Sequence, residues 1–201
     1  MYVKESLKTY IDDTAGRKPV PGGGSTAAAA GALGAALSSM LARFTADNKR
    51  YGNVRPKIKI LLKKNEAIRR NLMRLIDKDV LVYGRLNAAF SAKRGCSPET
   101  KQRLLKDAAE VPFLICGLCY EAMDICTYLA ENANTNLITD AGCAGLLLEA
   151  AFSAALLNVK INLKYIKDSR FIAQKNGVLN KMAKNICRKR KQVMDRVGKF
   201  V

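Results

Sequence analysis

Apolar side chains recur along this chain at the spacing of helices, and the Val, Ile and Thr alternation typical of strands is absent. The pattern therefore predicts an all-α protein. The first three predicted helices are Val3–Thr14, one that follows a glycine-rich turn and ends near Phe44, and Pro56–Phe90. The fourth begins at Ser97-Pro98-Glu99, and Pro112 is expected to kink or divide it, so that it resumes as Phe113–Ala130. A fifth runs from Asn134 or Thr135 to about Ile166, and the last begins at Asp168.

Two stretches, Ala27–Ala42 and Ala141–Leu157, are apolar around nearly the whole helical circumference. Such helices are expected to be buried on all sides. We predict a multihelical bundle in which two buried central helices are wrapped by amphipathic ones, as a single domain over residues 1–201. Ala27–Ala42 is short and weakly hydrophobic for a membrane span, so a buried helix is favoured and no membrane partner is expected.

Composition narrows the chemistry. The chain has 35 Lys and Arg against 17 Asp and Glu, which gives a formal charge of +18. This excess favours an anionic partner such as nucleic acid, a membrane surface or an acidic small molecule. The alternative is that the charged residues only form solvated helix faces. The chain has no histidine, so acid–base chemistry falls to carboxylates, Lys, Tyr or Cys, and no metal site is expected. The six cysteines form no secreted framework, which indicates reduced thiols in a cytoplasm.

A glycine-rich turn precedes the first apolar helix, in the run PVPGGGS from Pro19 to Ser25. Prolines stiffen its approach, and Gly22, Gly23 and Gly24 permit backbone conformations closed to other residues. Ser25 is the predicted N-cap of the helix. The free N–H groups at such a helix start can bind an anion or a carbonyl oxygen, so this turn is a candidate ligand site.

Polar residues inside an apolar helix need a partner or a purpose. Asp140 and Asn158 lie 18 residues apart, about five helical turns, and so share a face, with Asn162 one turn further on. This stripe is able to hydrogen-bond a polar heterocycle. It is equally compatible with a structural role, in which the asparagines bridge helices and Asp140 caps a neighbour.

A second polar group lies in the third predicted helix, where Asp79 and Tyr83 are one turn apart among apolar residues. A partly buried carboxylate has a raised pKa, which suits an acid–base catalyst. The competing interpretation is a surface Asp paired with a nearby Lys or Arg.

Two further motifs favour structural roles. For the pair Cys116 and Cys119, core packing is favoured over redox or zinc chemistry. For the basic run Arg188–Lys191, a solvated helix face is favoured over a nucleic-acid patch.

Three segments together resemble the cyclodeaminase/cyclohydrolase family of folate enzymes: the Pro19–Ala30 turn and helix, the Asp77–Tyr83 stretch, and the Asn136–Asn162 block. The resemblance covers essentially the whole chain. It implies an all-helical, dimeric protein with a folate site near the glycine turn, and a catalytic aspartate that matches Asp79. Thr139 and Cys143 depart from the family pattern, where a serine and an aliphatic residue are more usual.

The resemblance leads us to expect hydrolysis of 5,10-methenyltetrahydrofolate to 10-formyltetrahydrofolate, with Asp79 activating the water. We expect a folate substrate, no separate cofactor, and a homodimer. Three alternatives stay open: cyclodeamination of formimidoyltetrahydrofolate, a catalytically silent folate binder, and a helical RNA- or partner-binding protein, although nucleic acid is not the expected partner. The expected substrate-binding residues are Pro21, Gly22, Gly23, Gly24, Ser25, Tyr83, Asn136, Asp140 and Asn158.

Overall fold

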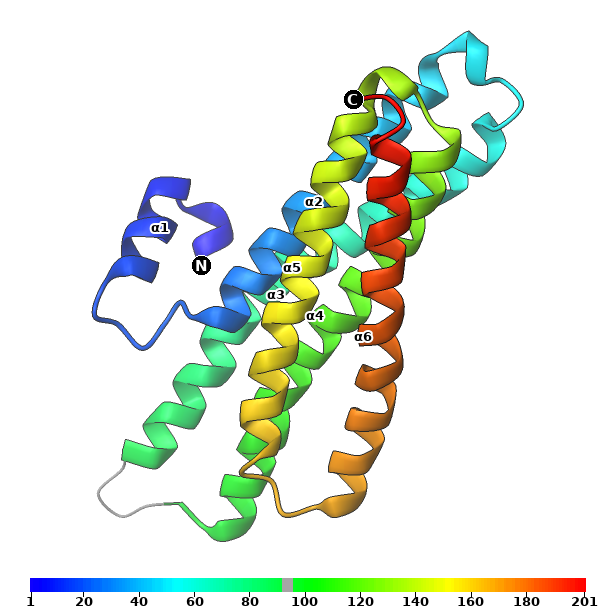
Figure 1. Cartoon of the computed structure of the whole chain (residues 1–201). Coiled ribbons are helices and arrows are strands. Elements are labelled where there is room, and N and C mark those ends of the chain that lie inside the picture. Colours follow the sequence, from blue (N-terminus) through cyan, green and yellow to red (C-terminus); the bar gives the residue numbers. More distant parts are fainter. Residues whose placement is uncertain (92–95) are drawn as a thin grey trace.

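The computed structural model describes residues 1–91 and 96–201, and this part of the chain contains helices and no β-strand (Figure 1). The all-α prediction is confirmed. Short 3₁₀ helices η1 (Tyr2–Lys4), η2 (Lys49–Tyr51) and η3 (Thr135–Leu137) accompany the α-helices. These are α1 (Leu7–Ala15), α2 (Gly23–Asp47), α3 (Arg55–Ser91), α4 (Pro98–Asn132), α5 (Ile138–Leu163) and α6 (Ser169–Val197).

Several helix starts follow from side-chain caps. The Ser97 hydroxyl accepts a hydrogen bond from Thr100 N (3.2 Å) at the start of α4, and the Asp168 carboxylate accepts one from Phe171 N (3.0 Å) at the start of α6. Both bonds satisfy N–H groups that have no partner within the helix. The predicted starts of these two helices are therefore confirmed.

Two local predictions are wrong. Ser25 is not an N-cap, because α2 begins at Gly23 and Gly22 occupies the cap position. Pro112 was expected to kink or divide its helix, and the division is wrong, because α4 is continuous from Pro98 to Asn132. Proline removes one backbone donor, but Pro112 and its neighbours Val111 and Ile115 are buried in the core, and this packing holds the helix together.

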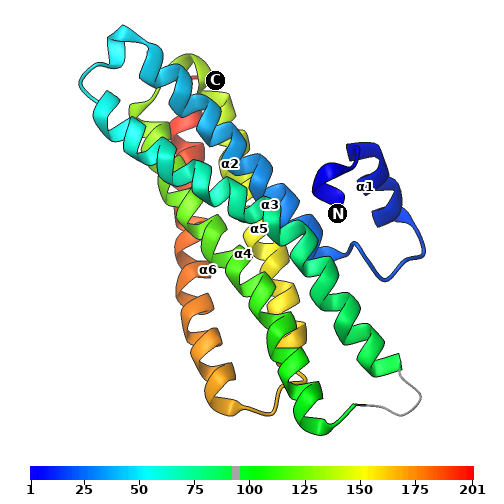
Figure 2. The ribbon, with the colours of Figure 1, turned by 180° about the vertical axis from the view of Figure 1, so that it is seen from behind.

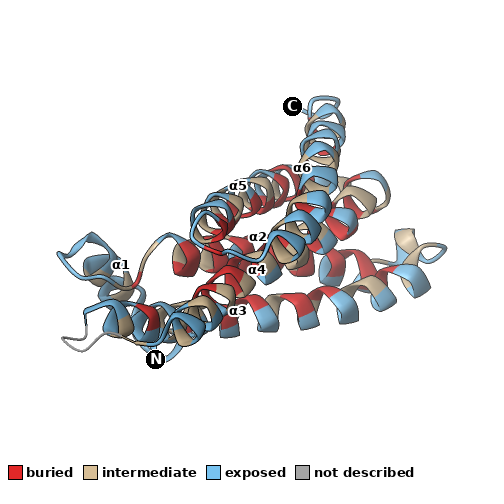
Figure 3. Ribbon diagram, turned by 90° about the horizontal axis from the view of Figure 1, so that it is seen from below, coloured by how far each residue is buried: buried red, intermediate tan, exposed pale blue. Residues whose placement is uncertain are grey.

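Helix α4 contacts α2, α3, α5 and α6, and it lies between α3 and α6 when the bundle is seen from behind (Figure 2). Helices α2 and α5 pack along each other and on α4. Buried residues from all these helices meet along the middle of the bundle, while its outer surfaces are exposed (Figure 3). The large side chains of this core include Leu41, Leu72, Met123, Leu148 and Phe152.

The prediction that α2 and α5 are buried on all sides is only partly right. Exposed apolar residues mark one side of each helix: Leu33 on α2 is 60% exposed, and Leu146 and Leu157 on α5 are 46% and 68% exposed. We call the surface defined by these three leucines the α2/α5 face. Helix α1 stands beside the bundle, near α2 (Figure 1).

By length and composition alone, three segments are long and apolar enough to cross a membrane: Gly23–Asp47, Pro98–Asn132 and Thr135–Leu163. The expectation that the second helix is too short to span is therefore wrong, since α2 has 25 residues. In this structure 61% of the apolar window of α2 is buried against other helices. The absence of a membrane partner stays a prediction.

Close packing of α2 on α5 depends on Gly34. A Cβ atom built there would lie 2.8 Å from Leu148 Cγ and 3.1 Å from the backbone oxygen of Ala144, which cannot move aside alone. We expect Gly34→Ala to lower the free energy of unfolding by about 1–3 kcal/mol in chemical denaturation. The control Gly177→Ala, on α6 with nothing within 4 Å of the added atom, should instead stabilise by up to ~1 kcal/mol. Equal effects of the two substitutions would contradict this packing.

Candidate active site

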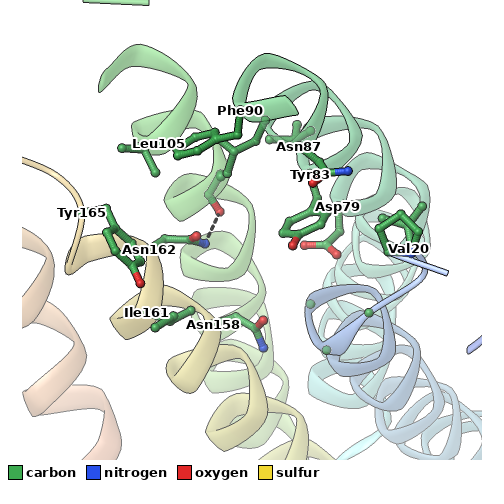
Figure 4. Close-up of a pocket in the computed structure, with 17 residues that line it drawn as sticks. Val20, Asp79, Tyr83, Asn87, Phe90, Leu105, Asn158, Ile161, Asn162 and Tyr165 are labelled. Atoms are coloured by element: carbon green, nitrogen blue, oxygen red, sulfur yellow. Dashed lines mark hydrogen bonds between the residues drawn. The ribbon is translucent and has the colours of Figure 1, made fainter. Parts of the chain in front are cut away.

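A cavity of about 540 Å³ opens between the Pro19–Gly24 segment, α3, α4 and the C-terminal part of α5. We call it the Asp79 cavity. Its volume lies within the range of small-molecule sites. Figure 4 shows Asp79 and Tyr83 on one side and Asn158, Asn162 and Tyr165 on the other. The remaining wall is mostly apolar and suits a flat ring system; it includes Val82, Leu86, Phe90, Leu105 and Ile161.

The Asp79 carboxylate lies against the first turn of α2. Its Oδ2 atom accepts a hydrogen bond from Ser25 N (2.9 Å), so a side chain of α3 satisfies an N–H group that has no partner within α2. Gly24 makes this approach possible, because a Cβ atom there would lie 2.1 Å from Asp79 Oδ1. The helix start was predicted to be a candidate site for an anion or a carbonyl oxygen of a ligand. At Ser25 its N–H group binds the protein's own carboxylate.

Burial raises the pKa of the Asp79 carboxyl to about 6, and the hydrogen bond from Ser25 opposes that rise. No Lys or Arg among the described residues contributes to this shift. The surface ion pair that competed with the catalytic interpretation is therefore not formed. A carboxyl with a pKa near 6 is able to give or take a proton close to neutral pH.

Two asparagines on α5 face Asp79 across the cavity. Asn158 Nδ2 donates to Ala154 O (2.9 Å), and Asn162 Nδ2 donates to Ala108 O on α4 (3.0 Å). Because these amide nitrogens are bonded to backbone oxygens, the side-chain oxygens are free to accept hydrogen bonds from a ligand. Asn162 thus bridges helices, as the structural alternative predicted, and also lines the cavity.

The residues of this cavity and the whole fold can be compared with known proteins. A profile of the formiminotransferase-cyclodeaminase family matches residues 6–181. The chain belongs to this family. A methenyltetrahydrofolate cyclohydrolase of Methylorubrum extorquens is 36% identical over 177 residues, which cover 85% of each chain. A rat formimidoyltransferase-cyclodeaminase is 28% identical over 172 residues, 83% of this chain and 32% of the rat protein.

The fold itself recurs within the family. A crystal structure of a formiminotetrahydrofolate cyclodeaminase from Thermotoga maritima superposes on this chain with a TM-score of 0.93 and 31% sequence identity. The match covers 98% of each chain. The resemblance drawn from the three sequence segments is therefore confirmed.

The structure brings most of the expected site residues to one place. Gly22, Gly23, Gly24, Tyr83 and Asn158 line the Asp79 cavity together with Asp79. Pro21 and Ser25 are buried next to it and do not line it.

Asn136 and Asp140 are not among the residues that line the cavity. Asp140 and Asn158 lie at opposite ends of α5, and 18 residues of helix span about 27 Å. Residues on one face of a helix can therefore be too far apart for one small ligand. The structure does not bring Asp140 to the Asp79 cavity, and a shared heterocycle for the two residues is excluded within one chain.

Sequence reasoning missed several lining residues. Asn87 and Phe90 continue the α3 stripe that begins with Asp79 and Tyr83, and Tyr165 follows Asn162 by three residues. Helical spacing from the residues already singled out was the signal that could have found them.

Core packing and ion pairs involve residues of the two other motifs. Cys116 and Cys119 are free and buried, and burial raises the pKa of the Cys116 thiol to about 12. In the basic run, Lys189 pairs with Asp124 and Arg190 with Glu149. Within residues 1–91 and 96–201, no three His, Cys, Asp or Glu side chains gather as metal ligands; the absence of a metal in the working protein stays a prediction.

The raised pKa of Asp79 predicts a pH-dependent cost to stability. Its pKa is about 6 in the fold against an ordinary value of 3.8, so the unfolded chain loses this proton at lower pH. The free energy of unfolding therefore falls as the pH rises from about 4 to 6, because the folded protein must lose a proton from a buried carboxyl. Above about pH 6 this destabilisation has its full value. Asp79→Asn should raise the free energy of unfolding by about 1–3 kcal/mol at pH 7.5 and by less at pH 4.

Asp168→Asn is the matched control, for which we expect the opposite change in the free energy of unfolding. The Lys106 ammonium and the Phe171 N–H lower the pKa of Asp168, so removal of this charge should destabilise the protein at pH 7.5. Denaturant titrations at both pH values measure the two variants. A destabilised Asp79→Asn at pH 7.5 would contradict the assigned burial.

Proposed function

We propose that this protein hydrolyses 5,10-methenyltetrahydrofolate to 10-formyltetrahydrofolate. The observation that carries the proposal is a buried carboxylate, Asp79, with a pKa of about 6 at the edge of a cavity sized for a pteridine. The proposal is supported by the 36% identity to a methenyltetrahydrofolate cyclohydrolase over 85% of both chains.

The reaction begins with water attack on the bridge carbon between N5 and N10, which carries positive charge in the substrate. Ionised Asp79 attracts this cation and takes a proton from the attacking water. The bond from the bridge carbon to N5 then breaks, and Asp79 gives its proton to N5. The hydroxyl on the bridge carbon loses its proton to solvent as the carbonyl forms, and the formyl group stays on N10. The net reaction consumes one water and releases one proton.

Recognition of the pteridine involves both sides of the cavity. The side-chain oxygens of Asn158 and Asn162 are acceptors for the ring's N–H groups, and the aromatic rings of Tyr83 and Tyr165 supply flat apolar contact. The excess of basic residues suits the anionic glutamate tail of the substrate.

Cyclodeamination of formimidoyltetrahydrofolate is the second candidate. It is supported by the similarity to the Thermotoga maritima cyclodeaminase, with 31% identity over 98% of each chain. In this reaction N10 bonds to the formimidoyl carbon and loses its proton to solvent. The bond from that carbon to the amino nitrogen breaks, and protonated Asp79 donates the proton with which the amine leaves as ammonia. A pKa of about 6 supplies both protonation states near neutral pH, so the same group serves either reaction.

The direct test is to follow loss of methenyl absorbance with purified protein and, separately, ammonia release from the formimidoyl substrate. Asp79→Asn should lower kcat roughly 10²–10⁴-fold because it removes the acid–base group. In the wild type, kcat/KM should fall below about pH 6, where Asp79 becomes protonated. The control Asp124→Asn, an exposed residue paired with Lys189, should retain activity.

Other outcomes assign other functions. Ammonia release alone favours the cyclodeaminase. Folate binding without turnover indicates a silent binder, and tight, salt-dependent binding to RNA without folate affinity would support the polyanion-binding alternative. Unchanged turnover in Asp79→Asn would remove Asp79 from the mechanism.

We infer that the protein works as a homodimer in the cytoplasm. Free thiols at all six cysteines suit a reducing compartment. The α2/α5 face presents exposed leucines, and a second copy of this chain is the expected occupant. Exposed apolar side chains on one face of a protein are typical of an association surface, and pairing of two copies would remove these leucines from water.

A charge placed on this face tests the dimer. Leu33→Arg and Leu157→Arg should shift the mass in light scattering from dimer to monomer, because each buries a charge in the interface. Ile60→Arg on α3, where the side chain is 65% exposed, is the control that should leave the dimer intact. A wild-type monomer at all concentrations would overturn this assignment.

A further inference from the structure

The N-terminal segment, Tyr2–Ala15, includes η1 and α1, and its helices contain no buried residue. It stands to one side of the bundle (Figures 1 and 2). Two side-chain hydrogen bonds join it to the described part of the bundle: Tyr2 N donates to Asp77 Oδ1 (2.6 Å), and the Tyr10 hydroxyl bonds to Ser25 Oγ (2.9 Å). A segment with so little apolar burial depends on these polar contacts for its position.

Both bonds reach the immediate surroundings of Asp79. Asp77 precedes Asp79 by two residues in α3, and Ser25 is the residue whose N–H bonds to Asp79. Ser25 is fully buried, so its hydroxyl and its backbone N–H both need hydrogen-bond partners within the protein. Its side chain bonds to Tyr10, and its backbone N–H bonds to Asp79.

We propose that Tyr10 is a positioning residue for Asp79: its hydroxyl, through Ser25, holds the first turn of α2 in the place where the Ser25 N–H meets the carboxylate. Without this hydroxyl the buried Ser25 Oγ loses its partner, and the turn shifts to satisfy it. The shift weakens the hydrogen bond to Asp79. The catalytic consequence of this inference rests on the proposed function, while the effect on the carboxylate itself does not.

The Tyr10 ring is half-buried, and desolvation raises the pKa of its hydroxyl. The hydroxyl therefore keeps its proton over the pH range in which Asp79 titrates. Since the Ser25 N–H stabilises the ionised form of Asp79, a weaker bond raises the pKa of Asp79 further. Tyr10 thus affects Asp79 through Ser25, besides the electrostatic effect that the Asp79 charge has on the Tyr10 hydroxyl.

Tyr10→Phe tests the proposal, with Tyr2→Phe as the matched control. The two rings pack edge to face with centroids 5.4 Å apart, but the Tyr2 hydroxyl bonds to Asp13 and not to Ser25. The first readout is the pKa of Asp79, measured by NMR on protein with ¹³C-labelled aspartate and assigned with Asp79→Asn. The second is the pH profile of kcat/KM.

Tyr10→Phe should raise the pKa of Asp79 by roughly 0.5–1 unit, as expected when one hydrogen bond to a charged group is weakened. The acid limb of kcat/KM should move by the same amount, and kcat should fall roughly 10-fold with little change in KM. Tyr2→Phe should move neither. Ser25→Ala removes the other end of the bond, so it should shift the pKa in the same direction, and the double variant should add little.

An Asp79 pKa that is the same in Tyr10→Phe, Tyr2→Phe and the wild type would overturn the proposal and leave Tyr10 as a docking contact only. If Tyr10→Phe fails to fold, Ser25→Ala provides the same pKa comparison. If the wild type lacks folate turnover, the proposed function fails, while the NMR titration still decides whether Tyr10 positions Asp79.

Discussion

The hydrogen bond from Ser25 N to Asp79 joins the start of α2 to the middle of α3, and the site depends on it. Ordinarily a helix satisfies its first N–H groups with a nearby side chain or with water. Here the partner comes from another helix and is buried, which raises the pKa of Asp79 to about 6. A single contact therefore anchors a helix end and prepares an acid–base group.

Close packing around small residues makes this contact possible. Gly24 leaves room for Asp79, Gly23 leaves room for the Asn158 amide, and Gly34 brings α2 against Leu148 on α5. The glycines thus bring Asp79 on α3 and Asn158 on α5 to the two sides of one cavity. Larger residues at these points would separate the walls or displace the carboxylate.

Most of the fold and part of the site could be predicted from the sequence, and the rest could not, for physical reasons. Helix periodicity and caps such as Ser97 and Asp168 are local, so they predicted the fold well. Asp79 stood out as a carboxylate among apolar residues. The prediction that Asp140 shares a site with Asn158 was wrong within one chain, because a shared helix face carries no information about distance along the helix axis. The partner of the Ser25 N–H could not be predicted, because it is a residue 54 positions away in the sequence.

The proposed function requires Asp79 and the α5 asparagines to lie on opposite sides of one bound pteridine. A crystal structure of the protein with a stable analogue of methenyltetrahydrofolate tests it most directly. We predict the ring between Tyr83 and Tyr165, with the bridge carbon close enough to the Asp79 carboxylate for one water to lie between them, each contact about 3 Å. An analogue bound elsewhere, or with its bridge carbon turned away from Asp79, would show that Asp79 does not act on this substrate.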